Sequence, residues 1–306
     1  MTATDASDGR LRGAATPDWL DRSRYPFEPD RLSLPAGEIS YVDEGEGPTL
    51  LFVHGNPTWS FLYRHLISGL SDEYRCVAPD LPGFGLSDDP AAFSYRPPAL
   101  ARTLRRFVDR LSLRDCALVL HDWGGPLGMD FATRRPEEVT GVVAMNTWCW
   151  PRERAFDRLS SAVTHTRLAR WLYLRHNVFA RAAVAPLVFS AAVSGRFDLA
   201  AARYRHYAAP LADPESRRAT WVLSGAVGRA RAWLSRIWRR RHALGETPIR
   251  LVWGGRDPIH GSFVRRWRTG FERTDATVLD GVGHFVPEEL GTALVEPVRR
   301  FAGVGR

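Results

Sequence analysis

Residues 119–125 (VLHDWGG) decide the fold of this chain. They form an apolar run that ends at a turn and passes into two glycines at the start of a helical pattern. Such a sharp turn between strand and helix holds the nucleophile in one large group of enzymes, where it reads Gly-x-Ser-x-Gly. Here the nucleophile position is Asp122. A carboxylate that attacks carbon forms an ester with the enzyme, which suits a leaving group on sp³ carbon or a strained epoxide.

Composition indicates a globular chain without a polyanionic partner. Its 306 residues are 44% apolar, which suffices for a large buried core. All 42 basic residues are Arg and give a net charge of +8, but they are scattered and no nucleic-acid-binding motif accompanies them. We therefore expect no nucleic-acid partner. The sequence makes no prediction of oligomeric state.

Several features predict a cytoplasmic location away from membranes. Three cysteines in or beside apolar runs are interpreted as buried thiols in a reducing cytosol. Residues 1–20 are polar, show no secretory signal and are expected to form a flexible tail. The longest nearly uncharged stretch, residues 182–193, is broken by Pro186 and is shorter than the roughly 20 residues of a membrane span.

Short β-branched runs alternate with helical patterns, which is typical of parallel βαβ units. The expected strands are 39–43, 49–53, 75–78, 117–120, 139–145, 249–253 and 276–279, and the expected helices between them are 61–70, 98–111 and 126–135. From residue 148 to about 214 the strand pattern stops and helical spacing takes over. We predict a core of 21–147 and 215–306 with a helical cap, 148–214, inserted between strands; residues 214–245 fit either part.

Four motifs follow the ends of predicted strands, where the ligand sites of open parallel sheets lie. They are residues 54–57 (HGNP), 122–123 (DW), 254–258 (GGRDP) and 281–285 (GVGHF). Their order along the chain is nucleophile, acid, histidine, as in the enzymes built on this strand-to-helix turn. Simpler interpretations exist, since Asp122 could cap a helix and Asp257 could merely form a turn before Pro258. His54 and His121 are interpreted as buried supporting groups.

On these motifs the chain resembles the haloalkane dehalogenases of the α/β-hydrolase superfamily. The resemblance spans roughly residues 25–301, and its most specific pieces are 54–58 (HGNPT), 80–87 (DLPGFGLS) and 121–125 (HDWGG). It implies an α/β-hydrolase fold, with a mostly parallel central sheet flanked by helices. It also implies that Asp122 displaces halide from carbon, that His284 activates water to hydrolyse the resulting ester, and that Asp257 holds the imidazole.

Two kinds of anion need hydrogen-bond donors in this reaction. The carbonyl oxygen of Asp122 becomes an oxyanion during ester hydrolysis, and the backbone N–H groups of Asn56 and Trp123 are expected to stabilise it. The leaving halide would be costly in an apolar pocket without donors. The resemblance supplies them as the side-chain amide of Asn56 and the indole N–H of Trp123. Pro210 resembles a cap proline at the same pocket, although the family often has Phe where Leu211 stands.

The acid also departs from a common family pattern. Many haloalkane dehalogenases carry Glu after the strand that precedes the cap, but Asn146 stands there, and an amide cannot balance an imidazolium charge. Asp257 matches the subfamilies whose acid follows the later strand. Asn146 is expected to hydrogen-bond near His284 or water, or to have a plain structural role. Trp148 and Phe285 could line the pocket or pack the cap on the core.

The alternatives come from two classes of protein. An epoxide hydrolase shares the Asp nucleophile and needs a proton donor, for which Tyr173, Tyr204 and Tyr207 are available, but Asn56 stands where that family usually has an aromatic residue. A non-catalytic small-ligand receptor on the same fold is the other alternative. We expect no metal and no cofactor, because residues 124–128 (GGPLG) lack the dinucleotide spacing and no clustered ligand motif occurs. The expected partners are a small apolar halogenated substrate, water and the halide product.

Overall fold

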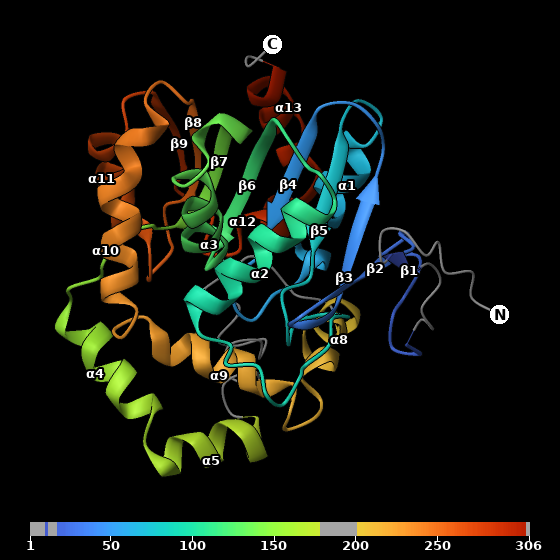
Figure 1. Cartoon of the computed structure of the whole chain (residues 1–306), viewed down its shortest axis with the longest axis vertical. Coiled ribbons are helices and arrows are strands. Elements are labelled where there is room, and N and C mark those ends of the chain that lie inside the picture. The colour runs from blue at the N-terminus through green and yellow to red at the C-terminus, as the bar shows by residue number, and fades with distance from the viewer. Residues whose placement is uncertain (1–9, 12–16, 178–200, 304–306) are drawn as a thin grey trace.

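The computed structural model describes residues 10–11, 17–177 and 201–303. Most of the expected N-terminal tail and the apolar stretch 182–193 lie outside these described residues. Nine strands form one sheet in the order β1-β2-β3-β5-β4-β6-β7-β8-β9, parallel from β5 to β9 and antiparallel on the β1 side (Figure 1). The strands are β1 (Arg10–Leu11), β2 (Asp30–Leu34), β3 (Gly37–Glu44), β4 (Thr49–Val53), β5 (Arg75–Pro79), β6 (Cys116–Asp122), β7 (Val139–Thr147), β8 (Ile249–Gly254) and β9 (Thr274–Leu279).

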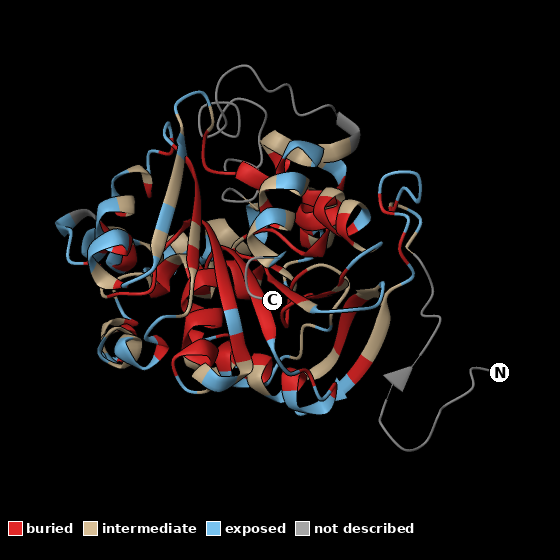
Figure 2. Ribbon diagram, turned by 90° about the horizontal axis from the view of Figure 1, so that it is seen from above, coloured by how far each residue is buried: buried red, intermediate tan, exposed pale blue. Residues whose placement is uncertain are grey.

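Helices cover both faces of the sheet, and each face has its own apolar core. The first core holds side chains of α2 (Pro97–Arg110), α3 (Gly124–Ala132), α10 (Arg231–Arg240) and α11 (Val264–Gly270). The second core holds side chains of α1 (Arg64–Leu70), α12 (Val286–Leu290) and α13 (Val295–Gly303). Between the two layers the central strands β4, β6 and β7 are buried over most of their length (Figure 2). Burial on both faces explains why β6 is an almost continuous apolar run rather than an alternating one.

A separate group of helices lies beyond one end of the sheet, at the bottom of Figure 1. It includes α4 (Ala155–Thr164), α5 (Arg167–His176), α8 (Ala201–Ala208) and α9 (Arg217–Ala226). Helix α9 packs against α4 and α5, although it lies after residue 214. The cap limits of 148 and 214 stay a prediction. Among the described residues, no helix combines the length and the apolarity of a membrane span.

Short 3₁₀ segments join these elements. They are η1 (Ser60–Tyr63), η2 (Pro136–Glu138), η3 (Ala209–Leu211), η4 (Arg241–Leu244), η5 (Gly261–Phe263) and η6 (Gly291–Leu294). All seven predicted strands are present, with ends within two residues of the prediction. The sequence missed β2, where only Leu32 and Leu34 alternate with polar residues, a pattern too short to stand out from a loop. The predicted helix 126–135 begins earlier, at Gly124.

Candidate active site

Asp122 occupies a tight turn between β6 and α3. It is the last residue of β6 and has a left-handed φ of 48°, a conformation that residues other than Gly seldom adopt. Atoms of β4 and β7 lie close to the turn. A Cβ atom at Gly124 would lie 1.9 Å from the carbonyl oxygen of Val53, and one at Gly125 would lie 1.8 Å from Oγ1 of Thr147. Glycine is therefore required at both positions, and the turn projects Asp122 from the sheet edge.

The two carboxylate oxygens of Asp122 face different neighbours. The backbone N–H of Asn56, after β4, donates to Oδ1 at 2.8 Å. No room exists for a side chain at Gly55, since its Cβ would lie 2.4 Å from Cβ of Asp122. The second oxygen, Oδ2, lies 3.8 Å from Nε2 of His284. Of the two predicted oxyanion donors, Asn56 makes its contact here; the backbone N–H of Trp123 makes no such bond among the described residues.

His284 follows β9 and is oriented by Asp257, which follows β8. The Nδ1 atom of His284 lies 2.9 Å from Oδ2 of Asp257, and both side chains are buried. Because the carboxylate can only accept, Nδ1 carries the hydrogen and Nε2, which faces Asp122, carries the lone pair when the ring is neutral. Burial disfavours a charged ring, but Asp257 and then Asp122 outweigh it and raise the pKa of His284 above its ordinary value.

Asn146 connects the end of β7 to this acid. Its amide Nδ2 donates to Oδ2 of Asp257 at 2.7 Å and to the carbonyl of Gly254 at 3.2 Å, while its Oδ1 accepts from the Gly254 backbone N–H at 2.7 Å. Asn146 also has a left-handed φ, of 39°. It therefore binds the acid directly rather than the histidine.

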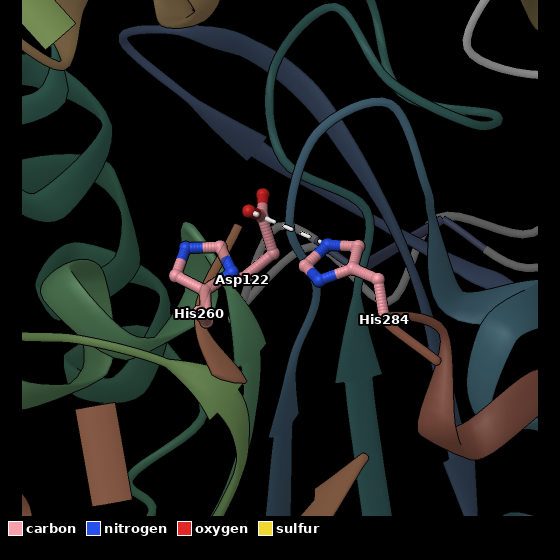
Figure 3. A group of neighbouring side chains, drawn as sticks. All are labelled: Asp122, His260 and His284. Atoms are coloured by element: carbon pink, nitrogen blue, oxygen red, sulfur yellow. Dashed lines mark ion pairs between the residues drawn. The ribbon is translucent and has the colours of Figure 1, made fainter. Parts of the chain in front are cut away.

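His260 is the residue of this site that the sequence analysis missed. It is buried three residues after Asp257, and its Nδ1 lies 3.2 Å from the same carboxylate oxygen that binds His284. Figure 3 shows it grouped with Asp122 and His284, and its ring stacks on the His284 ring at 5.1 Å between centroids. Its only sequence signal was its spacing of three residues from the acid. A histidine in a loop after a strand is common, so that signal carried little weight.

Two further buried histidines support the backbone and are neutral. The backbone N–H of Leu81 donates to Nε2 of His54 at 2.9 Å, so the hydrogen sits on Nδ1 and is donated to the carbonyl of Gly55. His121 lies with Nε2 2.9 Å from the carbonyl oxygen of His284. Burial lowers the pKa of His54 to about 4 and that of His121 to about 3. Both rings fix loops that carry the reacting groups.

The two predicted halide donors are placed differently. The indole N–H of Trp123 makes no hydrogen bond to any described residue, although the ring is buried. The Asn56 amide donates to Oγ of Ser224 at 3.1 Å and reaches the carbonyl of Thr220 at 3.5 Å, both on α9. Its Oδ1 is buried without a partner in the described part of the chain. The Asn56 side chain thus connects the loop after β4 to α9.

The other predicted pocket residues are Trp148, Phe285 and Pro210. Trp148 stacks on His260 at 5.0 Å between ring centroids and meets Trp123 edge-on at 4.9 Å. Phe285 lies 4.9 Å from the His284 ring. Pro210 is half-buried in η3, and none of the contacts described here joins it to Asp122.

Asp122, His260 and His284 form the one group of three potential metal ligands found among the described residues, with ligand atoms within 4.8 Å of one another. In this structure both imidazoles donate from Nδ1 to Asp257, and Asp122 Oδ1 accepts from Asn56. These bonds use Nδ1 of each imidazole and Oδ1 of Asp122, and they leave Nε2 of both imidazoles and Oδ2 of Asp122 without a hydrogen bond among the described residues. The arrangement can act chemically as a carboxylate nucleophile with a histidine base held by a second carboxylate.

Comparisons with known proteins identify the fold and its relatives. The family model for the alpha/beta hydrolase fold matches residues 48–289. The chain is 37% identical to haloalkane dehalogenase 2 of Mycobacterium tuberculosis over 90% of this chain and 96% of that protein. It is 32% identical, over the same shares, to a cis-3-alkyl-4-alkyloxetan-2-one decarboxylase of Xanthomonas campestris. The crystal structure of haloalkane dehalogenase DbeA from Bradyrhizobium elkani superposes with a TM-score of 0.78 at 25% identity, covering 90% of this chain and 97% of that one.

Proposed function

The chain belongs to the α/β-hydrolase family, among the haloalkane dehalogenases, and from this premise we propose that it hydrolyses haloalkanes to an alcohol, a halide ion and a proton. The observation that carries the proposal is the identity of the nucleophile. Asp122 occupies the turn between β6 and α3, 3.8 Å from a histidine that is itself held by Asp257. A carboxylate displaces a leaving group from sp³ carbon, which a Ser nucleophile is not suited to do.

In the first step an oxygen of Asp122 attacks the carbon that bears the halogen. A carbon–oxygen bond forms, the carbon–halogen bond breaks and the halide leaves with both bonding electrons. The departing anion is stabilised by the indole N–H of Trp123 and by the amide of Asn56, once that amide turns from Ser224 on α9. The product is an alkyl ester of Asp122.

In the second step water hydrolyses the ester. Nε2 of His284 takes a proton from the water, whose oxygen adds to the carbonyl carbon of the Asp122 ester. The resulting oxyanion is stabilised by the backbone N–H of Asn56, which already contacts Oδ1. Collapse of this intermediate expels the alkoxide, which takes the proton from the imidazolium to become the alcohol. The carboxylic acid left at Asp122 then ionises and releases the proton of the overall reaction. Asp257 stabilises the imidazolium while it lasts.

Isotopic labelling in solvent tests this sequence of steps. During turnover of 1-bromobutane in H₂¹⁸O, bromide and protons are released together, and mass spectrometry of the Asp122 peptide detects ¹⁸O in its carboxyl group. Asp122→Ala abolishes bromide release while circular dichroism shows an intact fold. If the alcohol carries ¹⁸O from the first turnover and Asp122 stays unlabelled, water attacks the substrate directly and the proposal is wrong.

A second substrate class is favoured by the similarity to the oxetan-2-one decarboxylase. An oxetan-2-one is a four-membered cyclic ester whose ring carbon C4 bears a carboxylate as its leaving group. Asp122 would attack that sp³ carbon as it attacks a haloalkane, and the ring C4–O bond would break to free the carboxylate. The carboxylate would then leave as carbon dioxide while its C–C electron pair forms the alkene and the Asp122 carboxylate departs from C4. Parallel assays with a bromoalkane, a cis-3,4-dialkyl oxetan-2-one and styrene oxide separate the three chemistries: bromide release alone supports the dehalogenase, and carbon dioxide release alone supports the lactone.

The cap and the location of the protein belong to the same proposal. We infer that residues 148–214 form the cap and that Pro210, Trp148 and Phe285 line its pocket. Cys76, Cys116 and Cys149 are free thiols buried in the core, and their state favours a reducing cytoplasm.

A further inference from the structure

One carboxylate oxygen serves two imidazoles in this site. Oδ2 of Asp257 accepts from Asn146 at 2.7 Å, from His284 at 2.9 Å and from His260 at 3.2 Å. The other oxygen, Oδ1, accepts the backbone N–H of Ile259 at 2.7 Å. A carboxylate oxygen has two lone pairs, so three donors on Oδ2 must share it. The hydrogen bonds that His260 and Asn146 make to this oxygen therefore weaken its hydrogen bond with His284.

His260 is fixed in this position by its ring neighbours. It stacks on Trp148 with an interplanar angle of 16° and on His284 with an angle of 23°, at 5.0 and 5.1 Å between centroids. The Phe263 ring meets it edge-on at 5.2 Å. The side chain is 1% exposed, and its Nε2 has no hydrogen-bond partner in the described part of the chain.

These surroundings determine the protonation state of His260. A charged ring would leave a buried N–H at Nε2 without a hydrogen-bond partner, which is costly. The neutral ring with its hydrogen on Nδ1 leaves only a lone pair unpaired. Burial accordingly lowers the pKa of His260, and the bond to Asp257 does not restore it. His260 is therefore a neutral donor to Asp257 and does not serve as a second base.

We propose that His260 is a positioning residue for the water-activating base: by taking one of the three hydrogen bonds at Oδ2 of Asp257, it weakens the hold of that carboxylate on the His284 proton. This deepens the proposed function and rests on it, since ester hydrolysis needs His284 in its neutral form. Without a competing donor, Asp257 would keep His284 protonated to higher pH. The Trp148 stack keeps the competing donor in place.

Other charged and titratable groups face this pair and must stay constant in a test. Asp122 lies on the Nε2 side of His284, His121 of β6 lies 4.8 Å from its ring, and Glu289 of α12 acts on it electrostatically. Arg152 lies 5.4 Å from the centroid of the Trp148 ring, but it is paired with Asp157. None of these groups is changed by a substitution at residue 260.

An isosteric pair of variants tests the proposal. His260→Met removes the donor, whereas His260→Gln retains a neutral N–H donor in a side chain of nearly the same shape. The His284 pKa is measured by ¹⁵N NMR of the imidazole in the resting protein, with the signal assigned by its loss in His284→Phe. We expect His260→Met to raise this pKa by about one unit, the equivalent of roughly one hydrogen bond. His260→Gln is expected to leave it within about 0.3 units of the native value on the same scale.

The same pair is then compared in catalysis. The acid limb of the pH profile for ester hydrolysis moves upward by the same amount in His260→Met and stays in place in His260→Gln. If both variants leave the NMR pKa unchanged, or shift it equally, His260 is only a packing residue and the proposal is overturned. Should His260→Met not fold, His260→Phe removes the donor while keeping the ring stack. The NMR titration needs no substrate, so a protein without dehalogenase activity would refute the proposed function without affecting this result.

Discussion

The floor of the site and its cap side satisfy their polar groups in different ways. On the floor, at the ends of β6, β8 and β9, the Asp257 carboxylate accepts four hydrogen bonds and Asp122 Oδ1 accepts one. On the cap side, the Trp123 indole has no partner among the described residues. The Asn56 amide donates hydrogen bonds to α9, and its Oδ1 has no hydrogen-bond partner among the described residues. All four hydrogen bonds at the Asp257 carboxylate are formed before substrate arrives, whereas the donors on the cap side still have bonding capacity left.

This difference separates chemistry from ligand binding. Groups whose partners are fixed are preorganised for a charge that develops in the reaction, and they need no rearrangement when it does. Donors left without a partner, or bonded to a single neutral acceptor, suit a ligand that binds and dissociates, such as halide. Substitutions on the floor should therefore change single chemical steps, whereas substitutions on the cap side should change affinity for substrate and halide.

The largest effect is expected from His284→Phe, a substitution on the floor of the site. It leaves Asp122 able to attack but removes the base, so each molecule should release one bromide and stop as the alkyl ester. Intact-protein mass spectrometry is expected to show one added alkyl group, located on the peptide that contains Asp122. His54→Phe is an unsuitable control because it breaks the bond to Leu81, so His242→Phe, at an exposed histidine of η4, serves instead. Repeated turnover by His284→Phe would mean that another group activates water.

Asp257→Asn should slow ester hydrolysis without stopping it. The variant removes the charge that stabilises the imidazolium, and we expect a fall of about 10²- to 10⁴-fold in this step. Without the carboxylate the pKa of His284 falls, because Asp257 is the group that raises it. The remaining activity should then persist to lower pH, the opposite of the shift expected for His260→Met. Single-turnover hydrolysis of the alkyl-enzyme between pH 5 and 9 measures both, and an unchanged rate would remove Asp257 from the acid role.

The same contrast explains how much could be predicted from the sequence. Asp122, His284 and Asp257 follow strands whose apolar runs fix their register, so their position at one sheet edge was predictable. The α/β-hydrolase fold was predicted correctly for the same reason. His260 was not, because its position depends on stacking against Trp148, a partner over 100 residues away in the chain. The contact between Asn56 and α9 likewise depends on how the helices beyond the sheet pack, which local sequence does not encode.

On the cap side, Asn56→Ala removes a halide donor but keeps the backbone N–H that binds Asp122. Bromide release in a single turnover should fall by about 10²-fold, the usual effect of losing one donor to a developing anion. Hydrolysis of the preformed ester should be nearly unchanged, because that step uses the backbone N–H. Rapid-quench measurement of the two steps separates them. Equal loss in both would show that Asn56 supports the floor and not the halide.

The smallest expected effect concerns the hydrogen bond to Ser224 that the Asn56 amide must break to bind halide. Ser224→Ala removes its acceptor on α9, so the amide no longer exchanges that bond for the anion. A neutral hydrogen bond contributes about 0.5–1.5 kcal/mol net, and much of it is recovered in water, so bromide should bind about 2- to 5-fold tighter. Product inhibition by bromide measures this affinity. Thr220→Val is the matched control on the same helix, because Thr220 meets Asn56 only through its backbone carbonyl and should leave bromide affinity unchanged. Weaker bromide binding in Ser224→Ala would instead mean that α9 holds the amide in its halide-binding orientation, and that the cap side is as preorganised as the floor.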